Sequence, residues 1–173
     1  MALVVFLRGV NVGRHKRFLP AQLARDVAEF DVVNVGAAGT FVVRASAAPS
    51  AIRAAIGRQL AFEAAMVIVT GRELLEFVAT EPFGRRPPAS NEQRFLAVLV
   101  ERPRAVPTLP VTIPQTAKWQ VKVVSRSGRF VASVWRRQAG TLLYPNVAIE
   151  KLIGAATTRN WNTIRAICKI LQP

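Results

Sequence analysis

The order of apolar segments in the first seventy residues restricts the fold of this chain more than any other feature. Short apolar runs typical of buried strands cover residues 3–7, 32–35, 41–44 and 66–69. Apolar residues at helical spacing cover residues 20–30 and 50–60, and Gly36 to Gly39 predict a hairpin turn. This β-α-β-β-α-β order predicts a ferredoxin-like half of an α+β protein, with a four-stranded antiparallel sheet and both helices on one face.

A smaller α+β half is predicted for the rest of the chain. Thr70 and Glu73 form a capping box that begins a helix ending before Pro82. The turn-forming stretch that follows divides the chain into a subdomain of residues 1–82, a linker of residues 83–92, and a subdomain of residues 93–173 packed on the first. In the last subdomain we expect strands near residues 95–100, 119–123 and 130–135, an extended proline-rich loop over 103–114, and two C-terminal helices.

The hairpin between the last two of these strands has a predicted register. A three-residue loop over residues 126–128 would place Ser125 opposite Arg129, and so Trp119 opposite Trp135. Cross-strand aromatic pairs contribute about 0.2–1 kcal/mol relative to alanine pairs. The alternative is that the two Trp rings lie in different cores.

The stretch over residues 155–163 combines hydroxyl, amide, arginine and aromatic side chains between two apolar helices. Gly154 ends the first helix, which begins at residues 144–145. Thr157 or Thr158 is expected as the N-cap of the second helix. In that helix the residues at core spacing are Trp161, Ile164, Ile167, Cys168 and Leu171. A helix N-terminus beside an arginine favours anions, and the alternative is a capped helix that binds nothing.

The charge of the chain is large and uneven. The sequence holds 24 Lys and Arg against 10 Asp and Glu, a net charge of +14. Residues 1–80 carry nine basic and six acidic side chains, while residues 81–173 carry fifteen and four, a net charge of +11. Such a charge attracts phosphates and nucleic acids, unless it reflects composition alone. A nucleic-acid patch is predicted from the basic residues around the hairpin, Lys118, Lys122, Arg126, Arg129, Arg136 and Arg137.

Several kinds of protein are disfavoured by what the sequence lacks. Its apolar runs are too short for a membrane span, and the N-terminal run is too short for a signal peptide. A single cysteine, Cys168, permits no internal disulfide and suits a reducing cytoplasm. Walker A, H-E-x-x-H, G-x-S-x-G and paired-cysteine motifs are missing, so neither a metal nor a cofactor is predicted. His15 lies in a basic run and is expected to be a solvated loop residue, not a general base.

Motifs at both ends of the chain resemble those of one bacterial family. The N-terminal motif FLRGVNVG covers residues 6–13, and the C-terminal motif consists of IEKL at 149–152 and ATTRNWNT at 156–163. Both resemble signatures of the family called domain of unknown function 1697, and the helix ending in Pro82-Phe83 resembles its middle. The resemblance implies a small α+β protein with a ferredoxin-like half and no established activity. Where that family has an Ile-Gln-Ser-Gly-Asn-like turn, residues 35–40 of this chain carry fewer polar side chains.

Three functions are weighed for this protein, whose location is expected to be cytoplasmic and whose oligomeric state the sequence does not specify. The first is binding of a phosphate-bearing ligand, nucleic acid included, at one site formed by residues 8–13 and 157–161. Its ligand-binding residues are Arg8, Gly9, Asn11, Gly13, Thr157, Thr158, Arg159, Asn160 and Trp161. The second is an enzyme acting on a small phosphorylated metabolite, for which no general base or other catalytic residue stands out. The third is an interaction module whose motifs are structural only.

Overall fold

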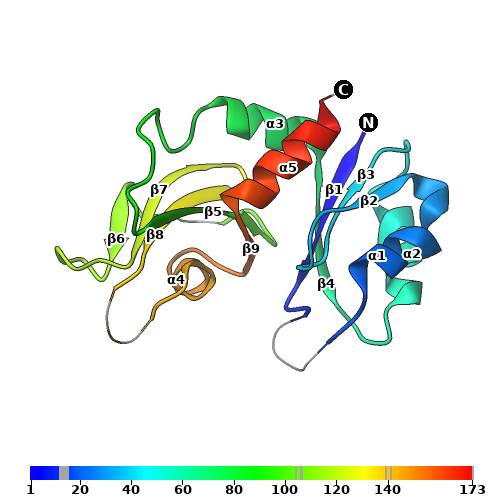
Figure 1. Cartoon of the computed structure of the whole chain (residues 1–173), viewed down its shortest axis with the longest axis horizontal. Helices are drawn as coiled ribbons and strands as arrows, with labels where there is room; N and C mark the ends of the chain where they lie inside the picture. The colour runs from blue at the N-terminus through cyan, green and yellow to red at the C-terminus, as the bar shows by residue number, and fades with distance from the viewer. Residues whose placement is uncertain (12–15, 104, 106, 139, 141, 173) are drawn as a thin grey trace. The chain divides into compact units, whose positions relative to one another are not determined.

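Two antiparallel sheets and five α-helices make the chain an α+β protein, as predicted, in the part that the computed structural model describes (Figure 1). That part comprises residues 1–11, 16–103, 105, 107–138, 140 and 142–172. The chain forms two units, Met1–Leu75 with Arg165–Pro173, and Glu76–Ile164. Helices α3 (Gly71–Ala79) and α5 (Trp161–Leu171) each hold residues of both. The division expected at residues 83–92 falls within the second unit and stays a prediction. No helix among the described residues is both long and apolar enough to cross a membrane.

The first unit contains a four-stranded antiparallel sheet, as expected. Its elements are β1 (Leu3–Arg8), α1 (Pro20–Asp26), the 3-10 turn η1 (Ala28–Phe30), β2 (Val32–Asn34), β3 (Thr40–Val43), α2 (Pro49–Gln59) and β4 (Ala65–Thr70). The strand order is β2-β3-β1-β4. A proline occupies the first turn of both α1 and α2, where its missing N–H leaves no hydrogen bond unmade.

Alternation along β1 directs one set of side chains toward the two helices. Leu3, Val5 and Leu7 of β1 belong to the same buried cluster as Leu23 of α1 and Ile52 of α2. Both helices therefore pack on one face of this sheet, as predicted, and Figure 1 shows them on the same side of it. Full burial of each such aliphatic side chain contributes roughly 1.5–3 kcal/mol.

The second unit is built on a five-stranded antiparallel sheet of order β6-β7-β8-β5-β9. Its elements are β5 (Glu92–Leu99), β6 (Val111–Ile113), β7 (Val121–Ser127), β8 (Phe130–Arg136), α4 (Pro145–Leu152) and β9 (Ala156–Asn160). One face packs on α4, where Ile149 lies in a cluster with Ala97 and Val131. The other face meets the second-unit part of α3, because Phe77 stacks on Phe130 with ring centroids 5.3 Å apart.

Two expectations for this unit are wrong. The proline-rich stretch is not wholly irregular, since β6 forms within it. Pro110 and Pro114 flank that strand at the sheet edge, where a missing N–H breaks no interior ladder. The hairpin turn is also shorter than predicted, because Ser127 pairs with Phe130 and leaves two residues between them. Gly128 supplies a φ of +55°, which a tight hairpin turn favours.

The shorter turn separates the two tryptophans that were expected to pair. Trp135 lies opposite Val121, and its ring stacks on Tyr144 with centroids 5.7 Å apart. The ring of Trp119 lies under the guanidinium of Arg136, whose central carbon is 3.8 Å from the ring centroid. The predicted Trp119–Trp135 pair is therefore wrong, because turn length sets the register of every residue along a hairpin.

Candidate functional site

The first motif forms a turn held by Asn11. The Asn11 side chain donates from Nδ2 to the carbonyl of Ala37 (2.9 Å), and its Oδ1 accepts from the backbone N–H of Phe18 (3.0 Å). Asn11 has a φ of +53°, a left-handed conformation that asparagine adopts more readily than most residues. Gly9 also has a positive φ, +66°. These contacts tie the end of β1 to the β2–β3 turn; Gly13 and His15 lie outside the described residues.

A pocket of about 580 Å³ adjoins this turn. It is lined by Asn11, Arg17, Phe18, Leu19, Pro20 and Ala37. Arg17 is its one charged lining residue among those described, and the other walls are mostly apolar. The shape therefore suits a small ligand that has one anionic group and an apolar body.

The second motif forms a strand that buries its arginine. Arg159 is only 6% exposed, and its Nη1 donates to Thr157 Oγ1 (2.8 Å) and to the carbonyl of Thr158 (2.9 Å). Burial lowers the pKa of the Arg159 guanidinium to about 10, because the charged form loses its hydration. Thr157 is 4% exposed. The Arg159 side chain is thus buried and forms hydrogen bonds to residues of its own strand.

The predicted cap of the last helix is wrong. Thr157 and Thr158 lie in β9, and α5 begins only at Trp161. Asn160 has the capping role, because its Oδ1 accepts from the backbone N–H of Asn162 (2.9 Å). Pairing of β9 with β5 draws the two threonines into the sheet.

The two motifs fall in different units. Residues 8–11 belong to the first unit and residues 157–161 to the second. The expectation that they meet in one ligand site stays a prediction.

The basic residues around the hairpin are divided between the two faces of the second sheet. Lys122 lies opposite Val134. The extra residue Val124 forms a β-bulge, after which Arg126 lies opposite Val131, a residue of the core against α4. A one-residue insertion reverses the side to which later side chains point. Lys122 and Arg126 therefore lie on opposite faces, although both were expected in one nucleic-acid patch.

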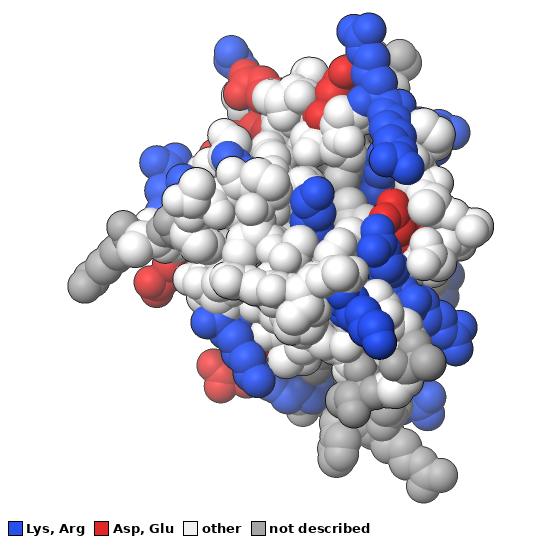
Figure 2. Space-filling view, turned by 90° about the vertical axis from the view of Figure 1, so that its left-hand side faces the viewer, with Lys and Arg blue, Asp and Glu red and all other residues white. Residues whose placement is uncertain are grey.

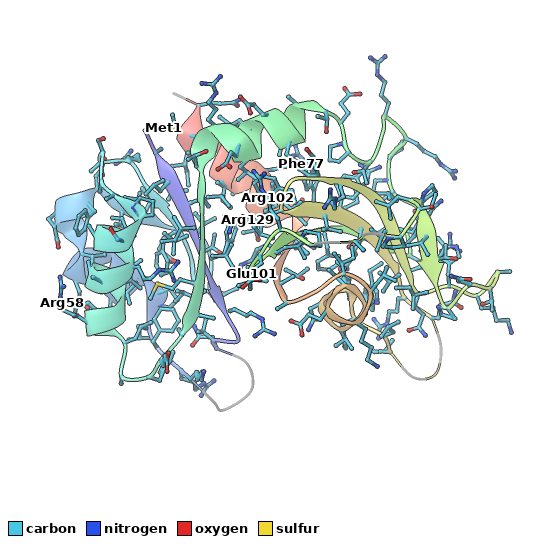
Figure 3. The ribbon with its side chains drawn as sticks, turned by 180° about the vertical axis from the view of Figure 1, so that it is seen from behind. Met1, Arg58, Phe77, Glu101, Arg102 and Arg129 are labelled. Atoms are coloured by element: carbon cyan, nitrogen blue, oxygen red, sulfur yellow. The ribbon has the colours of Figure 1, made fainter. Side chains whose placement is uncertain are left out.

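Arg129 lies at the turn, at the opposite end of β8 from Arg136. Its Nη1 donates to the carbonyl of Val100 (3.3 Å). Figure 3 labels it together with Glu101 and Arg102, beyond the end of β5. A second pocket, of about 480 Å³, is lined there by residues 99–103 and 153–155. Arg129 is therefore not part of a common patch with Arg136.

Three cations from neighbouring strands gather at the other end of the sheet. Arg94 of β5 and Lys122 of β7 both lie opposite Val134 of the intervening strand β8, one on each side. Arg136 is two residues further along β8 on the same face. We call Arg94, Lys122, Arg136 and the half-buried Val134 between them the cationic face. Figure 2, which views the molecule from the side of β6, shows a band of Lys and Arg side chains with few acidic ones among them.

Aromatic rings and one carboxylate hold the two arginines of this face in place. Arg136 Nη2 lies 2.8 Å from Glu92 Oε1, and this hydrogen bond lowers the pKa of the Glu92 carboxyl below its ordinary value. The Arg94 guanidinium lies 5.0 Å from the centroid of the Phe83 ring. The rings of Phe83 and Trp161 form a T-shaped contact with centroids 4.8 Å apart. Arg94 also donates to the carbonyl of Arg86.

Sequence reasoning missed Arg94 and Glu92 because it began the strand at residue 95. The signal available was the alternation of Glu92, Arg94 and Leu96, which continues the period-two pattern of the strand toward its start. Among the described residues there is no group of three or more His, Cys, Asp or Glu that could hold a metal ion.

Comparison with known families adds one match. The sequence model described as "Protein of unknown function (DUF1697)" matches residues 1–128. The chain belongs to this family. That description states no activity, and the C-terminal motif of this member lies beyond the matched residues. None of the curated proteins and none of the solved structures matches the chain.

Proposed function

We propose that this protein binds a phosphate-bearing polymer, nucleic acid, through the cationic face of its second unit. The observation that carries the proposal is the position of Arg94 and Lys122 on either side of Val134. Neighbouring strands are about 4.8 Å apart, so the backbones that carry these two cations are only about 10 Å apart. Like charges repel at such a distance, and a polyanion relieves that repulsion.

The balance of charge around this face favours an anionic partner. The carboxylate of Glu92 lies beside this face, where it is already paired with Arg136. Three exposed cations lie close by in the chain or through a contact: Arg137 follows Arg136, Lys118 precedes Trp119, whose ring contacts Arg136, and the Arg86 carbonyl accepts from Arg94. Exposed cations near a phosphate backbone supply affinity through counterion release, without regard to base sequence.

The test is the salt dependence of binding to a labelled oligonucleotide of mixed sequence. On duplex DNA, log affinity should fall with log salt by about 0.9 per phosphate contacted. Lys122→Ala should weaken binding and reduce this slope by about one unit, while Arg126→Ala should leave both nearly unchanged. The two variants remove equal charge from one strand, on opposite faces. Equal effects of the two variants would show that binding depends on net charge alone and not on the cationic face. A lack of binding at about 0.05 M salt would refute the proposal.

A second candidate is the binding of a small phosphate-bearing molecule in the pocket beside Asn11. Arg17 supplies its cation, and Phe18, Leu19 and Pro20 supply apolar walls. Adenosine monophosphate should raise the melting temperature of the wild type more than inorganic phosphate does, and Arg17→Ala should abolish the rise. Arg58→Ala is the matched control, because Arg58 is an exposed cation of α2 in the same unit (Figure 3). No shift with either compound would reject this site.

We also propose a fold class for the first unit and a cellular location for the protein. The element order of the first unit and its strand order β2-β3-β1-β4 support a ferredoxin-like class. The single cysteine, Cys168, is free and buried, which suits a reducing cytoplasm. We propose no reaction, because the described residues around both surfaces offer no evident general base.

A further inference from the structure

The geometry points to single-stranded nucleic acid, with its bases stacked at the edges of the cationic face, as the preferred partner; this inference rests on the proposed function. The centre of the face is apolar. Val134 is half-buried there, and cations flank it on both neighbouring strands. A duplex presents its phosphates outward and keeps its bases inside the stack, so its base faces cannot contact the apolar centre of this surface. Single strands expose base faces, which stack on aromatic rings or on arginine planes.

Each edge of the face carries a ring paired with a guanidinium. On the β7 side the half-buried ring of Trp119 lies 3.8 Å from the central carbon of Arg136. On the β5 side the half-buried ring of Phe83 lies 5.0 Å from that of Arg94. Both arginines are planar groups held against a ring, so each pair offers stacking surface and positive charge together.

The pair at Trp119 is the more firmly held of the two. Arg136 is fixed by Glu92 at 2.8 Å, and its backbone N–H donates to the carbonyl of Gln120 (2.8 Å). The carbonyl of Trp119 accepts from Gln138 Nε2 (3.1 Å). Ring and guanidinium are thus ordered before any ligand arrives, which reduces the entropy lost on binding. We therefore assign the first stacked base to Trp119.

The experiment compares an oligothymidylate of about 12 nucleotides with a duplex of equal length, each labelled and titrated with the full chain. The wild type should bind the single strand more tightly. Trp119→Ala should weaken single-strand binding by roughly 5- to 150-fold, the range for loss of one stacked base, and change duplex binding little. Trp119→Phe should restore most of the loss, because it restores a ring. Tyr144→Ala is the matched control, since it removes an exposed, stacked ring of the same unit away from the cationic face.

Urea unfolding of Trp119→Ala establishes that the variant is folded at the assay temperature. Comparable wild-type affinity for single strand and duplex, with Trp119→Ala without effect, would overturn the single-strand inference and leave the proposed function standing. Equal weakening of both ligands by Trp119→Ala, without rescue by Phe, would also overturn it, because Trp119 would then only position Arg136. Failure to bind either ligand at low salt would remove the proposed function and this inference together.

Discussion

Arg159 and Arg136 lie on the same face of the same sheet and have opposite environments. Arg159 lies opposite Leu96 of β5, and Arg136 lies opposite Glu92 of that strand, four residues away on the same side. Arg159 is 6% exposed, bonded to its own strand, and has a pKa lowered by burial. Arg136 is partly exposed and paired with a carboxylate.

The difference comes from what covers each end of β5. Residues 92–95 of that strand are half-buried or exposed, whereas all its residues from Leu96 onward are buried. At the buried end Phe77 stacks on Phe130, which lies opposite Val98. At the open end the cations keep part of their hydration. A conspicuous arginine motif can thus be structural, while cations outside any motif form the accessible surface.

The largest loss of stability is expected from Arg159→Ala. The substitution removes a buried stem and leaves the hydroxyl of Thr157 without this donor, so it should lower the free energy of unfolding by about 2–4 kcal/mol. Urea denaturation measures the loss. Arg165→Ala, at an exposed position of α5, should stay within about 0.5 kcal/mol of the wild type. Equal stability of the two variants would show that Arg159 is not structural.

Substitutions at two neighbouring threonines of β9 distinguish the contribution of the hydrogen bond to stability from that of side-chain packing. Thr157→Val removes the acceptor of Arg159 Nη1 and should cost about 1–3 kcal/mol. Thr158 Oγ1 is buried with no hydrogen-bond partner among the described residues, so Thr158→Val should be neutral or stabilising by up to about 1 kcal/mol. Both changes preserve shape and branching. Chemical denaturation measures the free energy of unfolding of both variants. A larger loss in Thr158→Val than in Thr157→Val would contradict the hydrogen bonding described for β9.

At the open end, Arg136→Ala should cost less than either change at Arg159 or Thr157. It removes one partly exposed ion pair and the contact over Trp119, together about 1–2 kcal/mol. Arg137→Ala is the control, because the next residue is exposed and should change stability by less than about 0.5 kcal/mol. Thermal or urea unfolding gives the comparison. A loss as large as that of Arg159→Ala would mean that the two ends of β5 do not differ as described.

The smallest effect is a dependence on pH at Glu92. Arg136 lowers the Glu92 pKa below 4.5, so the folded state holds this proton less tightly than the unfolded chain does. The stability from this carboxylate is therefore present above pH 4.5 and is lost as the pH falls through the lower folded pKa. Glu92→Gln should cost up to about 1 kcal/mol at neutral pH. Urea unfolding at pH 7 and near pH 3 should show the gap to the wild type closing, and a constant gap would contradict the assignment.

The local pattern of the sequence determined much of this fold. Apolar periodicity predicted the two helices and four strands of the first unit, because an amphipathic segment shows its own period wherever it packs. The same pattern placed Ile164 and Ile167 on the buried side of α5, and both are fully buried. The motifs at the two ends resembled the family to which the chain belongs, and the basic second half followed from composition alone.

The tertiary structure decided which side chains are accessible. β9 pairs with β5, some sixty residues earlier in the chain, so a segment expected to cap a helix became a strand and its arginine was buried. The bulge at Val124 placed Arg126 on the opposite face from Lys122, and the two-residue turn separated Trp119 from Trp135. Propensity and periodicity act over a few residues, whereas register, bulges and coverage depend on strands that meet from distant parts of the chain. The local sequence thus determined the elements of the first unit and the net charge of the protein, whereas the packing of strands from distant parts of the chain set β9 in the sheet and set which cations face solvent.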